Sequence, residues 1–206
     1  MKIYTFDNAP NGRRLQLFLN YKGISIDTEQ VDMLSQAQLT DAYRAVVPTG
    51  TVPALVLDDG TVMTEVIGQC VYLEALHPDR PLLGSTALEK ALVMSWDHKL
   101  YGGLFNAIAS MLRNRSKAFE NRGLPGPLDL PQIPDLVTRG KLQVDYMLPE
   151  LDAHLATNTW VIGDTLTMAD IDLLVACDFL AWVKESIPET CGHLSDWYQR
   201  AAAELT

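Results

Sequence analysis

The sequence predicts a small α/β unit with the element order β-α-β-α-β-β-α, followed by a unit built only of helices. Three observations predict this fold class. Short apolar runs alternate with helical apolar patterns in the N-terminal part, a proline-punctuated segment follows, and no convincing strand occurs beyond it. We therefore expect an α/β domain over residues 1–78, a linker over 79–86 and an all-helical domain over 87–206.

Local signals predict the first four elements. Residues 2–6 read as a short buried strand, and residues 7–12 have the composition of a turn. Apolar residues at helical spacing then continue as far as Gly23, which is typical of a helix end. Residues 26–31 are a weaker strand pattern, and residues 36–44 predict a short helix.

The rest of the α/β unit is a hairpin and a helix. Residues 53–57 and 61–64 are strand patterns joined by Asp58-Asp59-Gly60, a turn of the Asp-Gly type. A helix follows and runs to about Leu76. We expect the strands joined by crossovers to pair in parallel and the hairpin strands to pair antiparallel.

Helical patterning dominates the second unit. Its first stretch runs from Ala87 to about Arg122 with a bend at Gly102-Gly103, and a loop with four prolines covers residues 123–135. Thr167 and Asp170 form a start like a capping box, with the acid in place of the usual Glu. The remaining helices are expected over residues 136–156, over residues 168–185 and after Pro188.

Composition limits the class of protein. The chain has 206 residues, 48% of them hydrophobic, and a net charge of −10. Residues 1–80 carry 6 basic and 10 acidic side chains, and this even acidic balance argues against nucleic-acid and anionic-membrane partners. Cys70, Cys177 and Cys191 have no CxxC spacing and fit reduced thiols, and the four histidines have no metal-ligand spacing. Without a signal peptide or an apolar run of the ~18 residues of a membrane span, we expect a soluble cytoplasmic protein without a metal.

The most informative stretch is Val52-Pro53, followed by Thr64-Glu65. Proline has no N–H and is tolerated in a sheet only at an edge or at a first position. A cis Val52-Pro53 bond would turn the backbone N–H and C=O of Val52 outward, where they can pair with a peptide-like ligand. Glu65, at the start of the next helix, would meet that ligand's ammonium group. The alternative is a trans proline that opens a strand and an acid that complements a helix dipole.

Taken together, these features resemble the cytosolic glutathione transferases over essentially the whole chain, with a thioredoxin-like first domain. The subgroup they resemble most is bacterial and fungal and is similar to yeast's second glutathione transferase. The segments that carry the resemblance are Ala9-Pro10-Asn11-Gly12-Arg13-Arg14, Thr51-Val52-Pro53, Tyr72-Leu73-Glu74-Ala75-Leu76, and Gly163-Asp164 through Asp170-Ile171.

The resemblance implies that glutathione is the cosubstrate and that Thr51, Val52, Pro53, Glu65 and Val66 bind it. Val52 would pair with the cysteinyl part, Pro53 would fix that geometry, and Glu65 with the next residue would hold the γ-glutamyl end. Family members usually have Ser where this chain has Val66. The missing hydroxyl bond is worth roughly 1.5–3 kcal/mol, whereas the backbone N–H at the helix start is retained.

A transferase of this kind must convert the glutathione thiol to a thiolate. The turn before the first helix holds no hydroxyl or thiol, so the amide of Asn11 is the best candidate donor and Asn8 is a weaker one. The alternative for Asn11 is a plain N-cap. Tyr101, Phe105 and Met111, with Ala9, are candidates for the electrophile pocket, and ordinary core packing is the alternative for each.

The leading hypothesis is a detoxifying transferase that joins glutathione to small electrophiles. Pro10-Asn11-Gly12 also resembles the nu class, which implies glutathione-dependent disulfide or peroxide reduction as an alternative. A non-catalytic binding protein on the same fold is the third hypothesis, because of Val66 and the hydroxyl-free turn. The resemblance further implies a homodimer. The resemblance would also place a water-holding group near Asn114 and Ser116, but Asn114 stands where a His is expected. We expect Ser116 and the neighbouring arginines to form a solvated helical face.

Overall fold

The structure, a computed structural model, describes residues 1–206 and contains two compact units. The first unit comprises Met1–Arg80 together with Leu124–Leu128, and the second comprises Pro81–Gly123 and Asp129–Thr206. Residues 77–86 hold no helix or strand.

The first unit has the predicted order of strands and helices. Proline at the first position of α1 removes an N–H that would have no helical partner, and Gly23 (φ +67°) ends the helix in a left-handed conformation. The N–H of Ile24 then bonds the carbonyl of Leu19 at 2.9 Å. The elements are β1 (Lys2–Thr5), α1 (Pro10–Lys22), β2 (Asp27–Gln30), the 3-10 turn η1 (Ala37–Leu39), α2 (Asp41–Arg44), β3 (Ala54–Val56), β4 (Val62–Met63) and α3 (Val66–Leu76).

The sheet has the strand order β2-β1-β3-β4. β1 and β2 are parallel, as expected for a crossover through α1, whereas β3 is antiparallel to β1 and to β4. The expectation that the second crossover also gives a parallel pair is wrong. α2 has only four residues and cannot carry the chain back along the sheet, so β3 starts at the end where β2 finishes.

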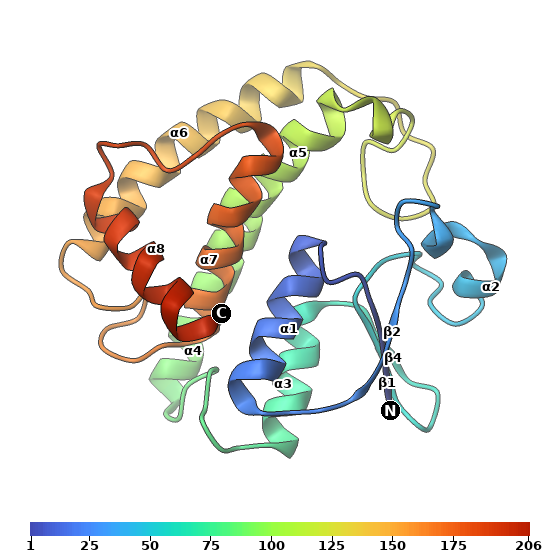
Figure 1. The fold of residues 1–206 in the computed structure, drawn as a ribbon, viewed down its shortest axis with the longest axis horizontal. Coiled ribbons are helices and arrows are strands. Elements are labelled where there is room, and N and C mark those ends of the chain that lie inside the picture. Colours follow the sequence, from blue (N-terminus) through green and yellow to red (C-terminus); the bar gives the residue numbers. More distant parts are fainter. The chain divides into compact units, whose positions relative to one another are not determined.

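Helices cover both faces of this sheet. α1 and α3 lie side by side on one face, and α2 lies toward the other, where the rings of Tyr4 and Tyr43 meet edge to face at 5.9 Å (Figure 1). Burying each large apolar side chain under α1 and α3 contributes roughly 1.5–3 kcal/mol. The most deeply buried of them are Ile3, Leu15, Phe18, Leu55 and Leu73.

The second unit is helical, apart from an isolated bridge between Arg122 and Leu130. The expected bend at Gly102-Gly103 is a short π-helical segment, and regular helix ends at Arg115 rather than near Arg122. The elements are α4 (Ala87–Leu100), the π segment η2 (Tyr101–Phe105), α5 (Asn106–Arg115), the 3-10 turn η3 (Lys117–Phe119), α6 (Asp135–Leu155), α7 (Met168–Leu180), the 3-10 turn η4 (Ala181–Val183) and α8 (Gly192–Leu205).

Close helix packing explains two glycines of this unit. A Cβ atom on Gly140 of α6 would lie 2.6 Å from the carbonyl oxygen of Ala107, and one on Gly103 would lie 2.6 Å from Sδ of Met147. α5 and α6 therefore pack side by side at short range (Figure 1). α7 is buried on nearly all sides, which is typical of a central helix. No helix combines the length and the apolarity needed to cross a bilayer.

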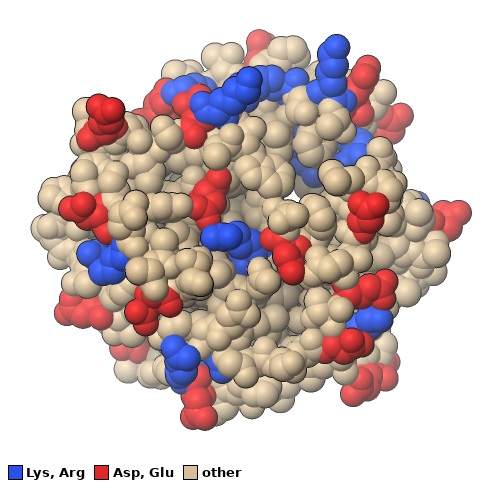
Figure 2. Space-filling model, viewed as in Figure 1, with Lys and Arg blue, Asp and Glu red and all other residues tan.

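Acidic and basic side chains are interspersed over the face seen in Figure 2. This mixing agrees with their even distribution along the sequence, in which residues 1–80 have 6 basic and 10 acidic side chains out of totals of 16 and 26.

Candidate functional site

The Val52-Pro53 peptide bond is cis. The ladder between β3 and β1 ends at the pair Tyr4–Ala54, so Val52 lies just beyond the paired residues of the strand. Its side chain is buried, which anchors the residue to the unit, and the chain bends at this position. Because the ladder does not include Val52, its backbone is a candidate for pairing with an extended peptide.

Tyr43 holds the residue before Val52. Its hydroxyl donates to the carbonyl oxygen of Thr51 at 2.8 Å, and the Thr51 hydroxyl lies 2.8 Å from that of Thr49. Burial raises the pKa of Tyr43, so the hydroxyl keeps its proton and remains a donor at neutral pH. Sequence reasoning missed this contact because Tyr43 lies in the short helix α2 and shows no motif.

Gln69 holds the residue after Val52. Its Nε2 atom donates to the carbonyl oxygens of Pro53 (3.0 Å) and Met63 (2.8 Å), and the residue is 0% exposed. It therefore connects α3 to both strands of the hairpin. Sequence reasoning missed Gln69 too, although a signal was available, because this polar residue lies at helical spacing between the apolar residues Val66 and Leu73.

Glu65 is the N-cap residue of α3, where the sequence predicts an acid at the start of the helix. Its side chain is exposed and makes no capping hydrogen bond. Val66 follows as the first helical residue with its side chain 3% exposed, so its contribution to the surface is the N–H at the helix start. A free carboxylate and unsatisfied N–H groups therefore stand together at this helix end. Their role in holding a γ-glutamyl group stays a prediction.

The start of α1 has no capping side chain. Ala9 is the N-cap residue, Pro10 is the first helical residue, and no acid occurs in the first turn, so the positive end of the helix dipole is not offset locally. Gly12 is required by close packing, because a Cβ atom there would lie 2.3 Å from the carbonyl oxygen of Phe6. This turn is therefore held tightly against the end of β1.

Asn11 is the second residue of α1, and the alternative of Asn11 as the N-cap is wrong because Ala9 is the N-cap residue and Pro10 is the first helical residue. Nη1 of the buried Arg14 donates to Oδ1 of Asn11 at 3.1 Å. A guanidinium has only donors, so it must meet the amide oxygen, and the amide NH2 is directed away from Arg14. Asn8 is exposed in the preceding turn. The role of either asparagine as a thiolate donor stays a prediction.

The segment Leu124–Leu128 belongs to the first unit although it interrupts the second in sequence. A Cβ atom on Gly126 would lie 3.1 Å from the carbonyl oxygen of Thr49, and one on Gly50 would lie 3.8 Å from Cδ of Pro127. The segment therefore lies against the residues that lead into Thr51 and Val52. Sequence reasoning predicted only a loop here, since nothing in its composition indicates a contact.

The candidate pocket residues have different surroundings. Phe105 and Met111 are 4% and 1% exposed in the core of the second unit, which fits the core-packing alternative. Tyr101 is half-buried, and its ring stacks on that of Phe105 at 5.8 Å and 29° within the π segment. Ala9, in the first unit, is half-buried. Their role in binding an electrophile stays a prediction.

The stretch around Asn114 is structural. Its Nδ2 donates to the carbonyl of Ser110 and its Oδ1 accepts from the N–H of Ile133, both at 2.8 Å. Arg113 donates to the carbonyl of Arg122 at 3.0 Å, and burial lowers its pKa to about 10. The expectation of a solvated face is therefore wrong for Arg113, because the loop after α5 folds back over it.

No three His, Cys, Asp or Glu side chains are grouped as metal ligands. Cys70, Cys177 and Cys191 are buried and form no disulfide, and burial raises the pKa of Cys177 and Cys191, which keeps both thiols protonated.

Comparison with known families matches both parts of the chain. Residues 9–76 match the glutathione S-transferase N-terminal domain, and residues 135–204 match the glutathione S-transferase C-terminal domain.

Individual relatives extend this match over more of the chain. Glutathione S-transferase 2 of Saccharomyces cerevisiae is 27% identical over 97% of this chain and 84% of its own length. Glutathione S-transferase GstA of Escherichia coli O157:H7 is 31% identical over 79% of this chain and 73% of its own. The crystal structure of a glutathione S-transferase domain-containing protein from Marinobacter aquaeolei has a TM-score of 0.90 and 31% identity over all of both chains.

Proposed function

Because this chain belongs to the glutathione S-transferase family, we propose that it binds glutathione and joins its sulfur to small electrophiles. The observation that carries the proposal is the frame around Val52, in which Tyr43 and Gln69 hold the carbonyls of Thr51 and Pro53. Two donors on either side of one residue, from the half-buried Tyr43 and the buried Gln69, keep that backbone ready to pair with an extended peptide.

The proposed binding mode uses the backbone of Val52 within this frame and the start of α3. The backbone of Val52 pairs with the cysteinyl residue of glutathione, and the carboxylate of Glu65 pairs with the α-ammonium group of the γ-glutamyl residue. The N–H of Val66 at the start of α3 bonds the neighbouring α-carboxylate, as helix N-termini do with anions. Glu65 is exposed and uncapped, so ligand binding does not have to break a bond within the protein.

The proposed chemistry begins with the thiol. A free thiol has a pKa of about 8.5, so only about 3% is ionised at pH 7. The uncapped start of α1 stabilises a nearby thiolate by roughly 0.3–1 kcal/mol, and a donated bond from Asn11 adds roughly 1.5–3 kcal/mol. Arg14 acts as a positioning residue by holding the amide oxygen, which leaves the NH2 group for the sulfur. The thiolate electron pair then forms a bond to the electrophilic carbon, and the leaving group departs with its bonding electrons.

Titration calorimetry with glutathione tests the binding step, and the ultraviolet absorbance of the thiolate as a function of pH tests its activation. We expect glutathione to bind at millimolar concentration or below and its thiol to titrate below its free pKa. Asn11→Ala is expected to raise that pKa by about one unit, equivalent to ~1.4 kcal/mol. Arg14→Met is expected to give a smaller rise. The absence of binding heat at millimolar glutathione contradicts the proposal.

Glutathione-dependent reduction of disulfides or peroxides is the second candidate. The observation that favours it is the turn Pro10-Asn11-Gly12, which offers an amide and no hydroxyl or thiol. One glutathione thiolate would attack a disulfide sulfur and release a thiolate, and a second glutathione would resolve the mixed disulfide to glutathione disulfide. Faster turnover of hydroxyethyl disulfide than of an aryl halide supports this reaction, and the reverse ranking supports conjugation. Binding without turnover of either substrate supports a non-catalytic role.

We also propose that the protein is a cytoplasmic homodimer. Each subunit would consist of a glutathione-binding domain over residues 1–78 and a helical domain over residues 87–206. Three buried cysteines without a disulfide suit a reducing compartment, and C2 dimers are the commonest oligomers. Sedimentation velocity of the full chain tests the dimer by its mass.

A further inference from the structure

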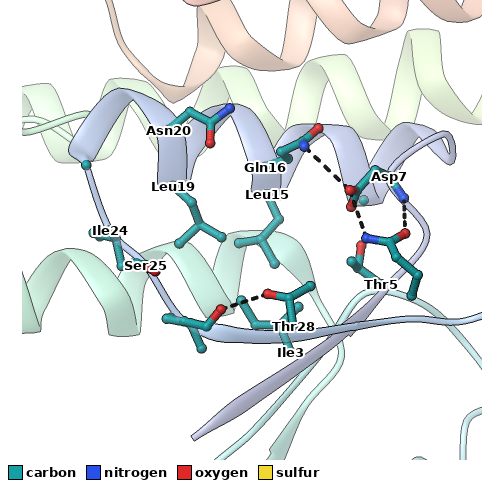
Figure 3. A pocket seen from close by; sticks show the side chains of 14 residues that line it. Ile3, Thr5, Asp7, Leu15, Gln16, Leu19, Asn20, Ile24, Ser25 and Thr28 are labelled. Atoms are coloured by element: carbon teal, nitrogen blue, oxygen red, sulfur yellow. Dashed lines mark hydrogen bonds between the residues drawn. The ribbon is translucent and has the colours of Figure 1, made fainter.

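A groove of about 690 Å³ runs between α1 and the edge strand β2. Figure 3 shows Leu15 and Leu19 pointing from α1 toward the sheet, with Asp7 at one end of the groove and Ile24 and Ser25 at the other. The volume lies within the ~300–1,000 Å³ typical of small-molecule sites. All fourteen lining residues belong to the first unit.

The groove exists because β2 is polar throughout. Its sequence is Asp-Thr-Glu-Gln, and all four residues are exposed. Thr28 and Gln30 pair with Ile3 and Thr5 in the parallel ladder, so they share the sheet face that α1 covers. Apolar side chains at these positions would fill the space beneath α1. The short polar side chains leave that space open above an apolar floor.

The floor is aliphatic with one buried polar group. Ile3 and Leu15 are each 1% exposed, and Leu19, Ile24 and Ile26 are half-buried along the groove. Thr5 also lines the groove, and its hydroxyl oxygen is buried.

One end of the groove carries a negative charge. Asp7 is the only ionisable side chain among the lining residues, and none of them is basic. Nε2 of Gln30 (2.8 Å) and Nε2 of Gln16 (3.5 Å) both reach Oδ2 of Asp7, and Gln30 also accepts from the Asp7 N–H at 3.2 Å. The carboxylate is therefore held in place with its other oxygen left to accept from a further donor.

We propose that this groove is a second small-molecule site, which binds amines that carry an apolar body of about the size of a phenylalkyl group. The ammonium group pairs with Oδ1 of Asp7, and the apolar body lies along Leu15, Leu19 and Ile24. Anions are disfavoured, because the groove holds a carboxylate and no cation, and residues 1–80 have a net charge of 6 − 10 = −4.

The site is distinct from the proposed glutathione site. In the strand order β2-β1-β3-β4, the groove follows the β2 edge, whereas Val52 and Glu65 lie at β3 and after β4. Asp7 and Gly12 of the groove are next in sequence to the proposed thiolate donors Asn8 and Asn11, but neither asparagine lines the groove. The proposal therefore does not depend on glutathione binding, and a ligand in the groove leaves the frame around Val52 accessible.

The test compares three probes with one carbon skeleton, phenylbutylamine, phenylbutanol and phenylbutanoate, by NMR titration of the ¹⁵N-labelled full chain at neutral pH. We expect the amine to bind about tenfold more tightly than the alcohol, equivalent to ~1.4 kcal/mol, and the carboxylate to bind most weakly. The largest amide shifts are expected between Gly23 and Gln30. Equal affinities for the three probes, or shifts centred elsewhere, overturn the proposal.

Variants separate a local charge pair from the general negative potential. Asp7→Asn should reduce the amine affinity to that of the alcohol, whereas the control Asp27→Asn, which removes a charge from β2 outside the groove, should change it less than twofold. Equal effects of the two variants overturn the proposal. Thr28→Tyr should fill the groove and weaken all three probes, with the ¹⁵N spectrum reporting the fold. Saturating glutathione should change the amine affinity less than twofold, and displacement of the amine by glutathione also overturns the proposal.

Discussion

Glu65 and Asp170 both lie at the start of a helix, in α3 and α7, but their carboxylates have opposite surroundings. Asp170 is 0% exposed and accepts from the N–H groups of Val161 (2.8 Å) and Thr167 (2.9 Å). It also accepts from the Thr167 hydroxyl (3.2 Å) and from Nε1 of Trp197 (3.1 Å). Glu65 is exposed and makes no capping bond.

The difference shows that an acid at the start of a helix can either be bonded within the fold or remain available for a ligand. Burial raises the pKa of Asp170, and its four donors act in the opposite direction by bonding the charged form. That carboxylate joins α7, α8 and the segment before α7, and it has no capacity left for a ligand. Glu65 joins nothing within the protein, so its charge is available at the surface.

Asp170→Ala should lower the free energy of unfolding by about 3–5 kcal/mol, because several buried donors lose their acceptor together. Urea denaturation followed by circular dichroism measures the loss. Asp170→Asn, which retains one acceptor oxygen, should fall between the wild type and the alanine variant. A loss below about 1 kcal/mol would show that water or other groups replace the carboxylate.

Glu65→Gln should weaken glutathione binding and leave the stability of the fold nearly unchanged. We expect the affinity for glutathione to fall about ten- to hundredfold, since one charge-assisted bond is worth roughly 1.5–3 kcal/mol. The unfolding free energy should change by less than about 0.5 kcal/mol, as for other exposed positions. Calorimetry and urea denaturation measure the two quantities, with Asp27→Asn as a charge-matched control. An unchanged glutathione affinity would remove Glu65 from the proposed site.

Gln69→Leu tests whether Gln69, rather than Glu65, stabilises the structure around the start of α3. The carbonyls of Pro53 and Met63 lose their donor, so we expect a loss of about 1–3 kcal/mol in unfolding free energy and weaker glutathione binding. Gln199→Leu, at an exposed position of α8, is the matched control and should have little effect. If Gln69→Leu matches that control, the frame around Val52 does not depend on this side chain.

Glu89, in the exposed capping box of α4, should show the smallest effect. Its carboxylate accepts from the N–H groups of Thr86 and Ser85, and these bonds hold its pKa below its usual value. Its stabilising contribution should be present at neutral pH and disappear as the pH falls through the lowered pKa. The difference in urea midpoint between wild type and Glu89→Gln, measured across acidic pH, checks this. A difference that grows on acidification would contradict it.

Some helix starts and ends were predictable because their signals lie in neighbouring residues. Gly23 ends α1 and Thr167 with Asp170 begins α7, as the local patterns indicate, whereas α1 begins at Pro10, inside the turn expected over residues 7–12. The direction of β3 was not predictable in this way. It depends on how far the intervening chain travels, and the short helix α2 does not cross the sheet.

The site was predictable in part for the same reason. Val52-Pro53 and the acid at the start of α3 are visible as sequence motifs. Tyr43, Gln69 and the segment Leu124–Leu128 are not, because each meets the Val52 region from an element distant in sequence. The groove beside β2 was not predictable from the sequence either. The polar residues that leave it open did, however, weaken the strand pattern of residues 26–31.

By itself, the sequence determined the two-part architecture, the end of α1, the start of α7 and the position of the strand that follows Pro53. These follow from backbone sterics and from apolar periodicity, which act over a few residues. Only the tertiary structure decided that the carboxylate of Asp170 is bonded within the fold and that of Glu65 is available for a ligand. The reason is that bonding depends on donors such as Trp197, which folding brings from distant parts of the chain.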